Sequence, residues 1–474
     1  MDTAFISQLS AIVGPDGVIS NKTALSVYDC DGYTLEKSTP EIVVLPRFTE
    51  EVAAVVKFLH KEKIAFVPRG AGTGLSGGCL PVEAPVMIGT SRMNKILHID
   101  LLNRYVIAQA GVVNLWVSNA VKSQGFQYAP DPSSQQACTI GGNVAENSGG
   151  PHTLKYGVTT NHVLGVELVL PDGEVIQLGG VVEDVPGYDL RGVTIGAEGT
   201  FGIVTQATLR LTRQPQAYRT FLAVFETVPQ ATQTVSDVIA AGIIPAALEM
   251  MDNLMIQAVE AAFHVGFPTD AGAVLIIELD GLEAGLDPQT QKIMTICERN
   301  AAREVRLARD EAERTALWKS RKRAIGAAGR LAPNYCTQDG VVPRTKVPDI
   351  LAAIAGIGEK YQLRIGNVFH AGDGNIHPIL LFDERNADET KRVLKAGQEI
   401  LKACVDLGGS LTGEHGIGVE KMGQMPLIFS PEDLLVMTQV RSVFNPENRC
   451  NPHKIFPTPH GCIDTRVPRR QASL

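Results

Sequence analysis

A glycine-rich segment from Pro68 to Gly78 is the sequence feature that most constrains the fold. It contains the spacing G-x-G-x-x-G at 72–77, which in a Rossmann fold leads directly into a helix whose N-terminus faces a diphosphate. Here Pro81 and Pro85 follow, and two prolines this close to the loop prevent such a helix. The context therefore argues against a Rossmann fold. What remains is either a purely structural glycine turn or a loop of backbone N–H groups suited to a diphosphate.

Two further segments rich in Gly, Ser and Asn follow, at 129–150 and 196–204. Three such loops in one domain are hard to explain as simple turns. Glycines allow another molecule to approach the backbone closely, and exposed backbone amides donate hydrogen bonds. The three segments together predict an extended groove for an elongated, partly planar cofactor.

The second half carries a polar motif in two pieces. His370 and His377 lie in a segment rich in Gly, Asn and Asp, and 413–416 reads Gly-Glu-His-Gly. Two neutral imidazoles and one carboxylate suit a divalent transition metal, and the second histidine beside the carboxylate suits a base. Adjacent residues on an extended chain point to opposite sides, so Glu414 and His415 reach one cavity only through a turn. The alternatives are structural histidines, or histidines that bind a carboxylate without a metal.

Hydrophobic patterning predicts a chain in which strands and helices are mixed. At 474 residues, two or three domains are expected. In the first part, strands are predicted at 42–46, 64–68, 86–89, 96–99, 106–109, 163–170, 175–178 and 203–211, and helices at 49–62 and 114–124. In the second part, strands are predicted at 221–225, 247–251 and 273–279, and helices at 229–241, 288–309, 311–329, 386–406 and 431–445.

Composition excludes several classes of protein. The eight cysteines contain no C-x-x-C, which argues against an iron–sulfur cluster, a zinc ribbon or a disulfide framework and fits a reducing compartment. A net charge of −8 without a basic block argues against nucleic acid as a partner. The N-terminus lacks a basic leader, and no apolar run approaches the ~18 residues of a membrane span. We expect a cytoplasmic protein, with peripheral docking to a membrane complex left open.

In their order, the three glycine-rich segments resemble the FAD-binding domain of the p-cresol methylhydroxylase/vanillyl-alcohol oxidase superfamily, and the resemblance extends over roughly residues 40–456. It implies FAD, held non-covalently because the first loop lacks the histidine that tethers FAD in some relatives. By this resemblance 69–78 cradles the diphosphate, 130–134 and 141–149 line the flavin, Ile203 contacts the adenine end and Asn451 returns to the isoalloxazine. The cofactor-binding residues so implied are Arg69, Gly70, Ala71, Gly72, Thr73, Gly74, Gly77, Gly78, Pro130, Asp131, Ser134, Gly141, Gly142, Asn147, Ser148, Gly149, Glu198, Gly202, Ile203 and Asn451.

The second half resembles the branch of that superfamily that holds D-lactate dehydrogenases, the flavoprotein subunits of glycolate oxidases and D-2-hydroxyglutarate dehydrogenases. The resemblance implies that His370, His377 and Glu414 bind a divalent metal (Zn, Mn or Fe) and that His415 is the base. Leu317-Trp318-Lys319-Ser320-Arg321 resembles a Leu-Trp-x-x-Arg motif of the branch. It implies that Arg321 binds the substrate carboxylate through its planar fork. The alternative is that the basic residues around it form a solvated helix face.

The substrate predicted from these motifs is a small 2-hydroxy acid. By resemblance, D-2-hydroxyglutarate dehydrogenases carry extra polar residues that bind the second carboxylate of their substrate. At the corresponding places this chain has His377-Pro378-Ile379 and Thr337-Gln338-Asp339, so these polar residues are absent. A second carboxylate buried without partners costs several kcal/mol, which favours glycolate or D-lactate. These two acids differ by one methyl group and are not separated by the sequence. The alternatives are a D-2-hydroxyglutarate dehydrogenase, a flavoprotein subunit active only within a multi-subunit glycolate oxidase complex, and a sugar or aromatic-alcohol oxidase.

The resemblance also predicts the domain order and the partners. The fold class is α+β: an N-terminal helical segment at 1–40, a two-subdomain FAD-binding domain at 41–213, a ferredoxin-like α/β cap domain with the metal site at 214–425, and a C-terminal helical segment at 426–457 that returns to the flavin. A polar tail at 458–474 is expected to be disordered. Without a cysteine cluster, electrons are expected to leave to a quinone, a soluble carrier or an iron–sulfur partner subunit, and direct reaction with oxygen is the alternative. A homodimer is left open.

Overall fold

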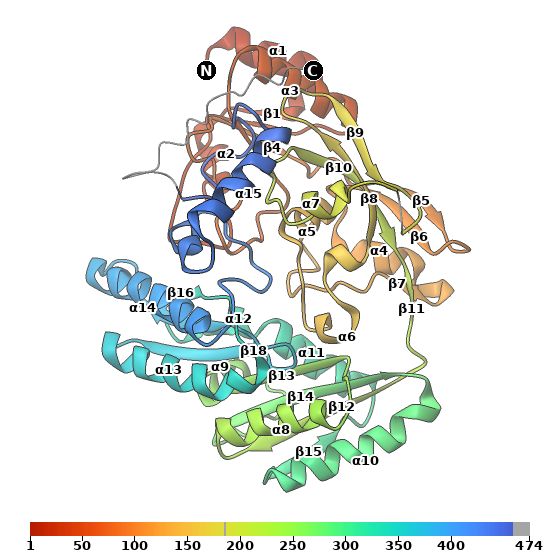
Figure 1. Ribbon diagram of the computed structural model, residues 1–474, viewed down its shortest axis with the longest axis vertical. Helices are drawn as coiled ribbons and strands as arrows, with labels where there is room; N and C mark the ends of the chain where they lie inside the picture. Colours follow the sequence, from red (N-terminus) through yellow and green to blue (C-terminus); the bar gives the residue numbers. More distant parts are fainter. Residues whose placement is uncertain (184–185, 458–474) are drawn as a thin grey trace.

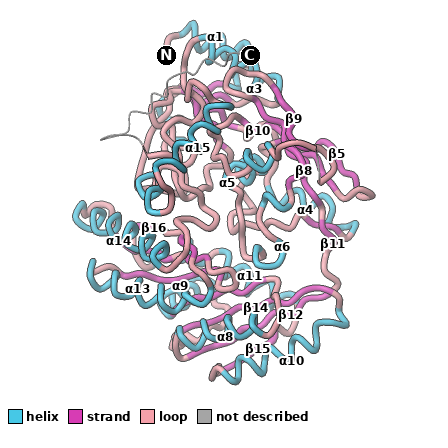
Figure 2. The backbone as a smooth tube through the Cα atoms, in the orientation of Figure 1, coloured by secondary structure: helices cyan, strands magenta, loops and turns pink. Residues whose placement is uncertain are grey.

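The computed structural model describes residues 1–183 and 186–457, so the predicted tail lies outside the described residues. Two bodies are stacked along the long axis of the molecule (Figure 1). The first contains the N-terminal strands, and the second contains the large sheet of the later part of the chain. The last helix, α15 (Pro431–Phe444), returns to the first body. Much of the first body is loop rather than helix or strand (Figure 2).

The first body begins with a small sheet in the order β1-β2-β4-β3, in which β2, β4 and β3 are parallel. Its central strands are short and fully buried, as parallel strands covered on both faces require. The helix α3 (Thr49–Lys61) packs its buried valines against this sheet. The strands are β1 (Val18–Ile19), β2 (Ile42–Val44), β3 (Phe66–Arg69) and β4 (Val86–Gly89), and α1 (Thr3–Val13) also contributes to this core.

An antiparallel sheet in the order β5-β6-β10-β8-β9 completes the first body. Buried and half-buried residues alternate along β10, as expected for a strand with one face on the core. Next to it lie α4 (Asn114–Val121) and the short helix α5 (Ile140–Glu146). The strands are β5 (Ile96–Asp100), β6 (Tyr105–Gln109), β8 (Val163–Val169), β9 (Val175–Gly179) and β10 (Ile203–Arg210), and the pair β7 (Phe126–Gln127) and β11 (Thr212–Arg213) leads to the second body.

The second body, the cap, is a nine-stranded sheet with a hydrophobic core on each face. Alternate residues of β12, β13 and β14 enter the two cores, which is why these strands are mostly apolar. Helices α8 (Val228–Ala240), α10 (Glu283–Arg299), α13 (Val347–Tyr361) and α14 (Ala387–Asp406) cover one face, and α9 (Asn253–Phe263), α11 (Glu311–Lys322) and α12 (Ala324–Ala327) the other. The strands are β12 (Ala217–Phe225), β13 (Ala247–Asp252), β14 (Ala273–Gly281), β15 (Glu304–Leu307), β16 (Asn334–Thr337), β17 (Gly340–Val341), β18 (Arg364–His370), β19 (Asn375–Ile376) and β20 (Pro378–Phe382).

The prediction of one helix over 288–309 is wrong. The helix α10 ends at Arg299, Ala301 adopts a left-handed φ of 57°, and β15 pairs with β12. Ala301 and Ala302 favour a helix locally, but pairing at the edge of the sheet decides the structure. The helices α9 and α13 were not predicted.

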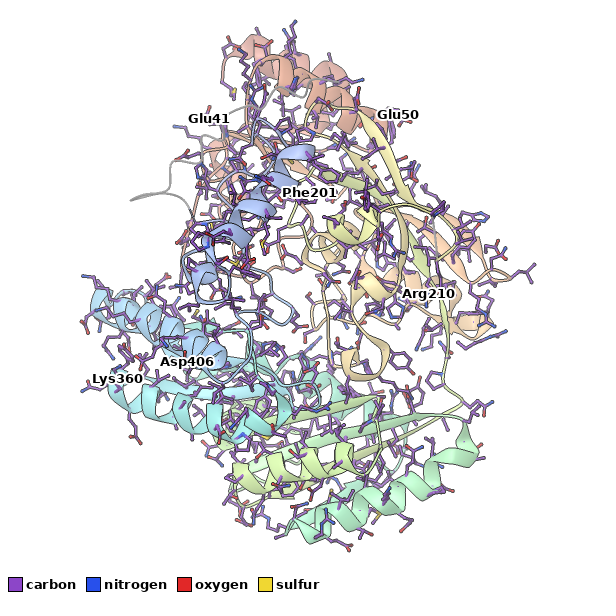
Figure 3. The ribbon with its side chains drawn as sticks, in the orientation of Figure 1. Glu41, Glu50, Phe201, Arg210, Lys360 and Asp406 are labelled. Carbon is purple, nitrogen blue, oxygen red and sulfur yellow. The ribbon has the colours of Figure 1, made fainter. Side chains whose placement is uncertain are left out.

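The C-terminal segment is held on the first body. Cys450 bridges to Phe66 of β3, and the backbone N–H of Asn451 donates to the carbonyl of Phe66 at 2.8 Å. The ring of Phe444 stacks on Phe201 at a centroid distance of 4.5 Å, and Phe201 is labelled in Figure 3. None of the helices within the described ranges is both long and apolar enough to cross a bilayer.

Candidate active site

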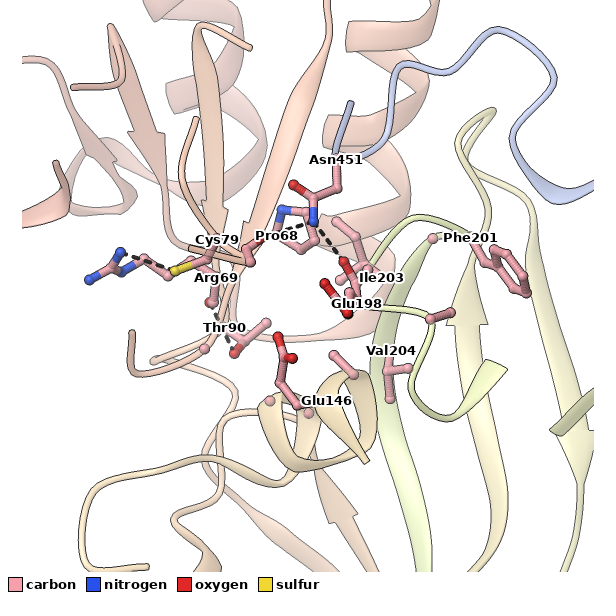
Figure 4. Close-up of a pocket in the computed structure, with 18 of the residues that line it drawn as sticks. Pro68, Arg69, Cys79, Thr90, Glu146, Glu198, Phe201, Ile203, Val204 and Asn451 are labelled. Carbon is pink, nitrogen blue, oxygen red and sulfur yellow. Dashed lines mark hydrogen bonds between the residues drawn. The ribbon is translucent and has the colours of Figure 1, made fainter. Parts of the chain in front are cut away.

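Two adjoining cavities lie where the three glycine-rich loops meet. We call the one lined by Gly78, Gly141, Glu198, Ile203 and Asn451 the glycine cavity (Figure 4). The second, the histidine cavity, is lined by the first loop and by His370, His377, Glu414, His415 and Arg321. Four residues line both cavities, and they are Gly70, Cys79, Gly142 and Glu146. The two cavities therefore form one continuous groove.

Most of the residues predicted to bind the cofactor line this groove. Those in the glycine cavity are Arg69, Gly70, Gly78, Gly141, Gly142, Glu198, Gly202, Ile203 and Asn451. Those in the histidine cavity are Gly70, Ala71, Gly72, Thr73, Gly74, Ser134, Gly142 and Ser148. Asn451 lies in the same cavity as Ile203, so the structure places it at the end predicted for adenine and not beside the histidines.

Five predicted residues lie behind the walls instead, and each has a structural contact. The carbonyl of Pro130 accepts from Asn114, and Asn147 ends α5 in a left-handed conformation. A Cβ on Gly77 would lie 2.4 Å from Val419, and one on Gly149 would lie 2.9 Å from Oε2 of Glu414. The carboxylate of Asp131 accepts from His152 at 2.8 Å and from Lys322 at 2.7 Å, which ties the first body to the cap.

The groove has the properties that FAD requires. Glycines and buried backbone form most of its wall, so a long flat molecule can lie against the backbone. Five side chains that line the groove carry buried polar atoms without a hydrogen-bond partner among the described residues: Glu146, Arg321, His377, His415 and Asn451. Buried polar atoms normally have partners, so these atoms indicate contacts to a bound molecule.

The histidine cluster is assembled from two segments of the cap. His370 is the last residue of β18, His377 lies between β19 and β20, and Glu414 comes from the loop after α14. Oε1 of Glu414 lies 3.4 Å from Nε2 of His370 and 3.2 Å from Nε2 of His377. The ring of His415 stacks on that of His377 at 5.0 Å. The predicted convergence of the two loops is thus present in the structure.

Glu249 of β13 supports the cluster from behind. Its carboxylate lies 2.8 Å from Nδ1 of His370, a contact that directs Nε2 of that ring into the cavity. The same carboxylate forms an ion pair with the guanidinium of Arg321, which is 1% exposed. Glu249 was missed in the sequence, although an acidic residue inside an apolar strand is a recognisable signal because charges are rarely buried unpaired.

Asp339 holds the loop that presents Glu414 and His415. Its Oδ2 accepts from the hydroxyl of Thr412 at 2.5 Å and from the backbone N–H groups of Gly413 at 3.0 Å and His415 at 2.9 Å. The backbone therefore curls around one carboxylate, and both side chains reach the same cavity. Gly416 follows with a φ of 86°, and a Cβ there would meet Glu146 at 2.4 Å, so only glycine fits this turn.

The cavity sets the charges of these groups. Burial alone would raise the pKa of Glu414, but hydrogen bonds from His370 and His377 hold it well below its usual range. Burial lowers the pKa of His415 to about 4, partly opposed by Asp339, so this imidazole is neutral at pH 7. For His370, the carboxylate of Glu249 outweighs burial and raises the pKa well above its usual value.

Together these features define a flavoprotein oxidoreductase, and comparisons with known proteins agree. The protein-family model described as "FAD binding domain" matches residues 40–179 of the sequence. The family model described as "FAD linked oxidases, C-terminal domain" matches residues 214–455. The chain belongs to the FAD-linked oxidase family. The predicted family, fold class and enzyme class are confirmed.

Curated relatives cover almost the whole chain. "Glycolate oxidase subunit GlcD" of Escherichia coli is 46% identical over 437 residues, which are 92% of this chain and 88% of the relative. The protein of that name from Bacillus subtilis is 41% identical, covering 95% of this chain and 96% of the relative. "D-lactate dehydrogenase" of Anaerostipes hadrus is 34% identical, covering 88% and 90%.

Solved structures share the fold at low sequence identity. The 4-ethylphenol oxidase from Gulosibacter chungangensis has a TM-score of 0.79 at 18% identity, covering 95% of this chain and 97% of that chain. The p-cresol methylhydroxylase has a TM-score of 0.79 at 17% identity, covering 95% and 96%. These likenesses bear on the fold alone.

Proposed function

We propose that this protein oxidises a small 2-hydroxy acid, glycolate or D-lactate, to the 2-oxo acid. The observation that carries the proposal is that Arg321, His370, His377, Glu414 and His415 face one cavity that adjoins the glycine cavity. Relatives named as a glycolate oxidase subunit and a D-lactate dehydrogenase support the same substrate class. Bound FAD supplies a two-electron acceptor for the hydride that leaves the substrate.

The proposed metal ligands are His370, His377 and Glu414. Their ligand atoms lie within 4.8 Å of one another, and two imidazoles with one carboxylate suit Zn, Mn or Fe. The ligand atoms of a second group, Asp339, His377 and His415, also lie within 4.8 Å of one another. The carboxylate of Asp339 is already occupied by the loop that it holds, which favours the first group. The metal would lower the pKa of the substrate hydroxyl.

His415 and Arg321 have the remaining roles. The neutral imidazole of His415 takes the hydroxyl proton at Nε2, which lies on the side of Glu414 at 4.0 Å from its Oε1. Arg321 pairs with the substrate carboxylate while Glu249 fixes its position. Arg321, His370 and His377 are buried and Glu414 and His415 are half-buried, which limits the access of water to the reacting atoms.

The charge of the cavity favours one carboxylate over two. Arg321 is the only Arg or Lys that lines the histidine cavity in the described part of the chain. Ile379 is fully buried in a cap core, and the amide of Gln338 donates to Glu420 at 3.0 Å. Neither side chain is placed to bind a second carboxylate, so we propose a monocarboxylate and not D-2-hydroxyglutarate.

We further propose an external electron acceptor: a quinone, a soluble carrier or an iron–sulfur partner subunit. The cysteines in the described ranges are all free thiols, and most of them are buried. The name of the relative GlcD as a subunit supports a partner chain.

A substrate screen tests the proposal. The purified holoprotein is mixed anaerobically with glycolate, D-lactate, L-lactate and D-2-hydroxyglutarate while the flavin absorbance is followed. Bleaching by glycolate or D-lactate is expected, and absence of bleaching by all four acids overturns the proposal. Turnover of the single chain with an artificial dye separates an autonomous enzyme from a subunit that needs its partners.

The metal is tested by elemental analysis of the same preparation. We expect about one Zn, Mn or Fe per chain, lost on chelation together with activity and lost in His370→Ala. FAD content is the control, because the glycine cavity does not contain these ligands. A chelated, metal-free protein with full activity would favour histidines that bind the carboxylate directly.

A further inference from the structure

Glu146 is the last residue of α5, and its carboxyl group lines the groove. Its Oε2 is buried and unpaired within the described residues. The side chain points into the glycine cavity, facing Glu198 and Asn451 (Figure 4). In contrast, both carboxylate oxygens of Glu198 have hydrogen-bond partners. They accept from the backbone N–H groups of Ile417 and Gly418 at 2.7 Å each.

Glu146 also stands where the two cavities meet. It is one of the four residues that line both, and the others are two glycines and Cys79. The thiol of Cys79 is already in contact with the guanidinium of Arg69 at 3.3 Å. Among the shared residues of the described chain, Glu146 therefore has the only free polar side chain.

The part of FAD that crosses this junction follows from the direction of the cofactor. The flavin must lie in the histidine cavity for hydride transfer, so the adenine lies toward Ile203; this step rests on the proposed function. The ribityl chain and the diphosphate then connect the two ends. Glu198 and Asp31 add negative charge around Glu146, and Lys421 opposes it. A second anion is disfavoured there, whereas a hydroxyl group is neutral and forms a hydrogen bond with a carboxyl of either charge.

We propose that Glu146 binds a ribityl hydroxyl of FAD and fixes the cofactor at the junction of the two cavities. The contact satisfies a buried oxygen that otherwise lacks a partner. Burial and the neighbouring Glu198 raise the pKa of Glu146 well above its usual value, which agrees with a neutral carboxyl beside the cofactor.

The test compares FAD with ADP, which lacks the ribityl chain and the flavin. Both are titrated into full-length apoprotein of the wild type, Glu146→Met and Glu146→Gln. We expect Glu146→Met to bind FAD about 10-fold more weakly and ADP with unchanged affinity. Glu146→Gln, which keeps an acceptor and a donor, is expected to retain most of the FAD affinity. Glu174→Gln, in an exposed turn, is the matched control.

Two outcomes overturn the inference. Equal weakening of FAD and ADP would place the contact on the ADP portion, and unchanged FAD binding by Glu146→Met would remove the contact. Glu146→Ala carries the same comparison if the methionine variant does not fold. The affinities do not depend on turnover, so a failed substrate screen would overturn the proposed function without deciding the role of Glu146.

Discussion

At the scale of single residues, Asp339 has the largest expected effect on the active-site geometry. Removal of its carboxylate in Asp339→Ala leaves the N–H groups of Gly413 and His415 unpaired and frees the loop. A displacement of about 1 Å at reacting groups costs on the order of 100-fold in rate, so we expect kcat to fall about 100-fold. FAD content should remain, because Asp339 does not line the groove.

Asp339→Asn is the companion variant. The amide keeps one oxygen for the loop. Its new N–H group replaces the oxygen that accepts from Nδ2 of Asn375, so the Asn375 amide must turn over and present its Oδ1, which is unpaired among the described residues. We expect a smaller loss of kcat than in the alanine variant. Equal loss in both would mean that charge, and not the hydrogen bonds to the loop, is the contribution of Asp339.

A replacement of Arg321 can separate two of its roles, the ion pair with Glu249 and the binding of the substrate carboxylate. Arg321→Lys keeps the charge opposite Glu249 but loses the planar fork that binds a carboxylate with two parallel hydrogen bonds. We expect KM for the 2-hydroxy acid to rise on the order of 10-fold or more, with a smaller change in kcat. Lys319→Met, on the exposed side of the same helix, is the control. An unchanged KM would assign the carboxylate to another group.

At the scale of elements, one carboxylate joins three elements near the cluster. Asp252 ends β13, caps α9 through the N–H of Met255, and accepts the backbone N–H of Asn367 on β18 at 2.8 Å. Asp252→Ala removes the cap and leaves the half-buried backbone N–H of Asn367 without this partner. We expect a loss of about 2 kcal/mol in the free energy of unfolding, measured with denaturant.

The matched control is Asp310→Ala, which removes only a helix cap. Asp310 caps α11 by accepting from Glu313 at an exposed position, so a loss of about 1 kcal/mol is expected. Equal losses in the two variants would show that the contact of Asp252 with β18 adds no stability.

The sequence predicts those elements whose pattern is local. The strand predicted at 42–46 and the amphipathic helix predicted at 49–62 appear close to their predicted bounds as β2 and α3. The structure of residues 300–309 and of the helix α13 was not predicted correctly. The strand β15 forms because it pairs with β12, and α13 is held because one face packs on the cap core; both contacts involve distant segments of the chain. In the site, His370 and Glu414 stand out by their motifs. Glu249 could not be placed behind His370 without knowing that β13 pairs with β18.

At the scale of the whole molecule, buried ion pairs connect the first body to the cap. His152 of the first body contacts Asp131 through Nδ1 at 2.8 Å and faces Glu278 of β14 through Nε2 at 3.5 Å. Further hydrogen bonds complete this network. Lys322 donates to Asp131 and Arg314 donates to Glu278. Lys155 and Tyr156 of the first body both donate to Asp280 of β14. The histidine cavity is lined by residues of both bodies, so these pairs help to hold its two sides together.

His152 makes this connection dependent on pH. Burial would lower its pKa, but Asp131 and Glu278 raise it to about 10. A histidine with a raised folded pKa contributes stability that is complete below the unfolded value of about 6.5 and is lost as the pH rises toward 10. We expect His152→Gln to be less stable than the wild type by about 3 kcal/mol at pH 6, with the difference closing by pH 10. His98→Gln, exposed on β5, is the control, and a difference that stays constant over this range would contradict a charged His152.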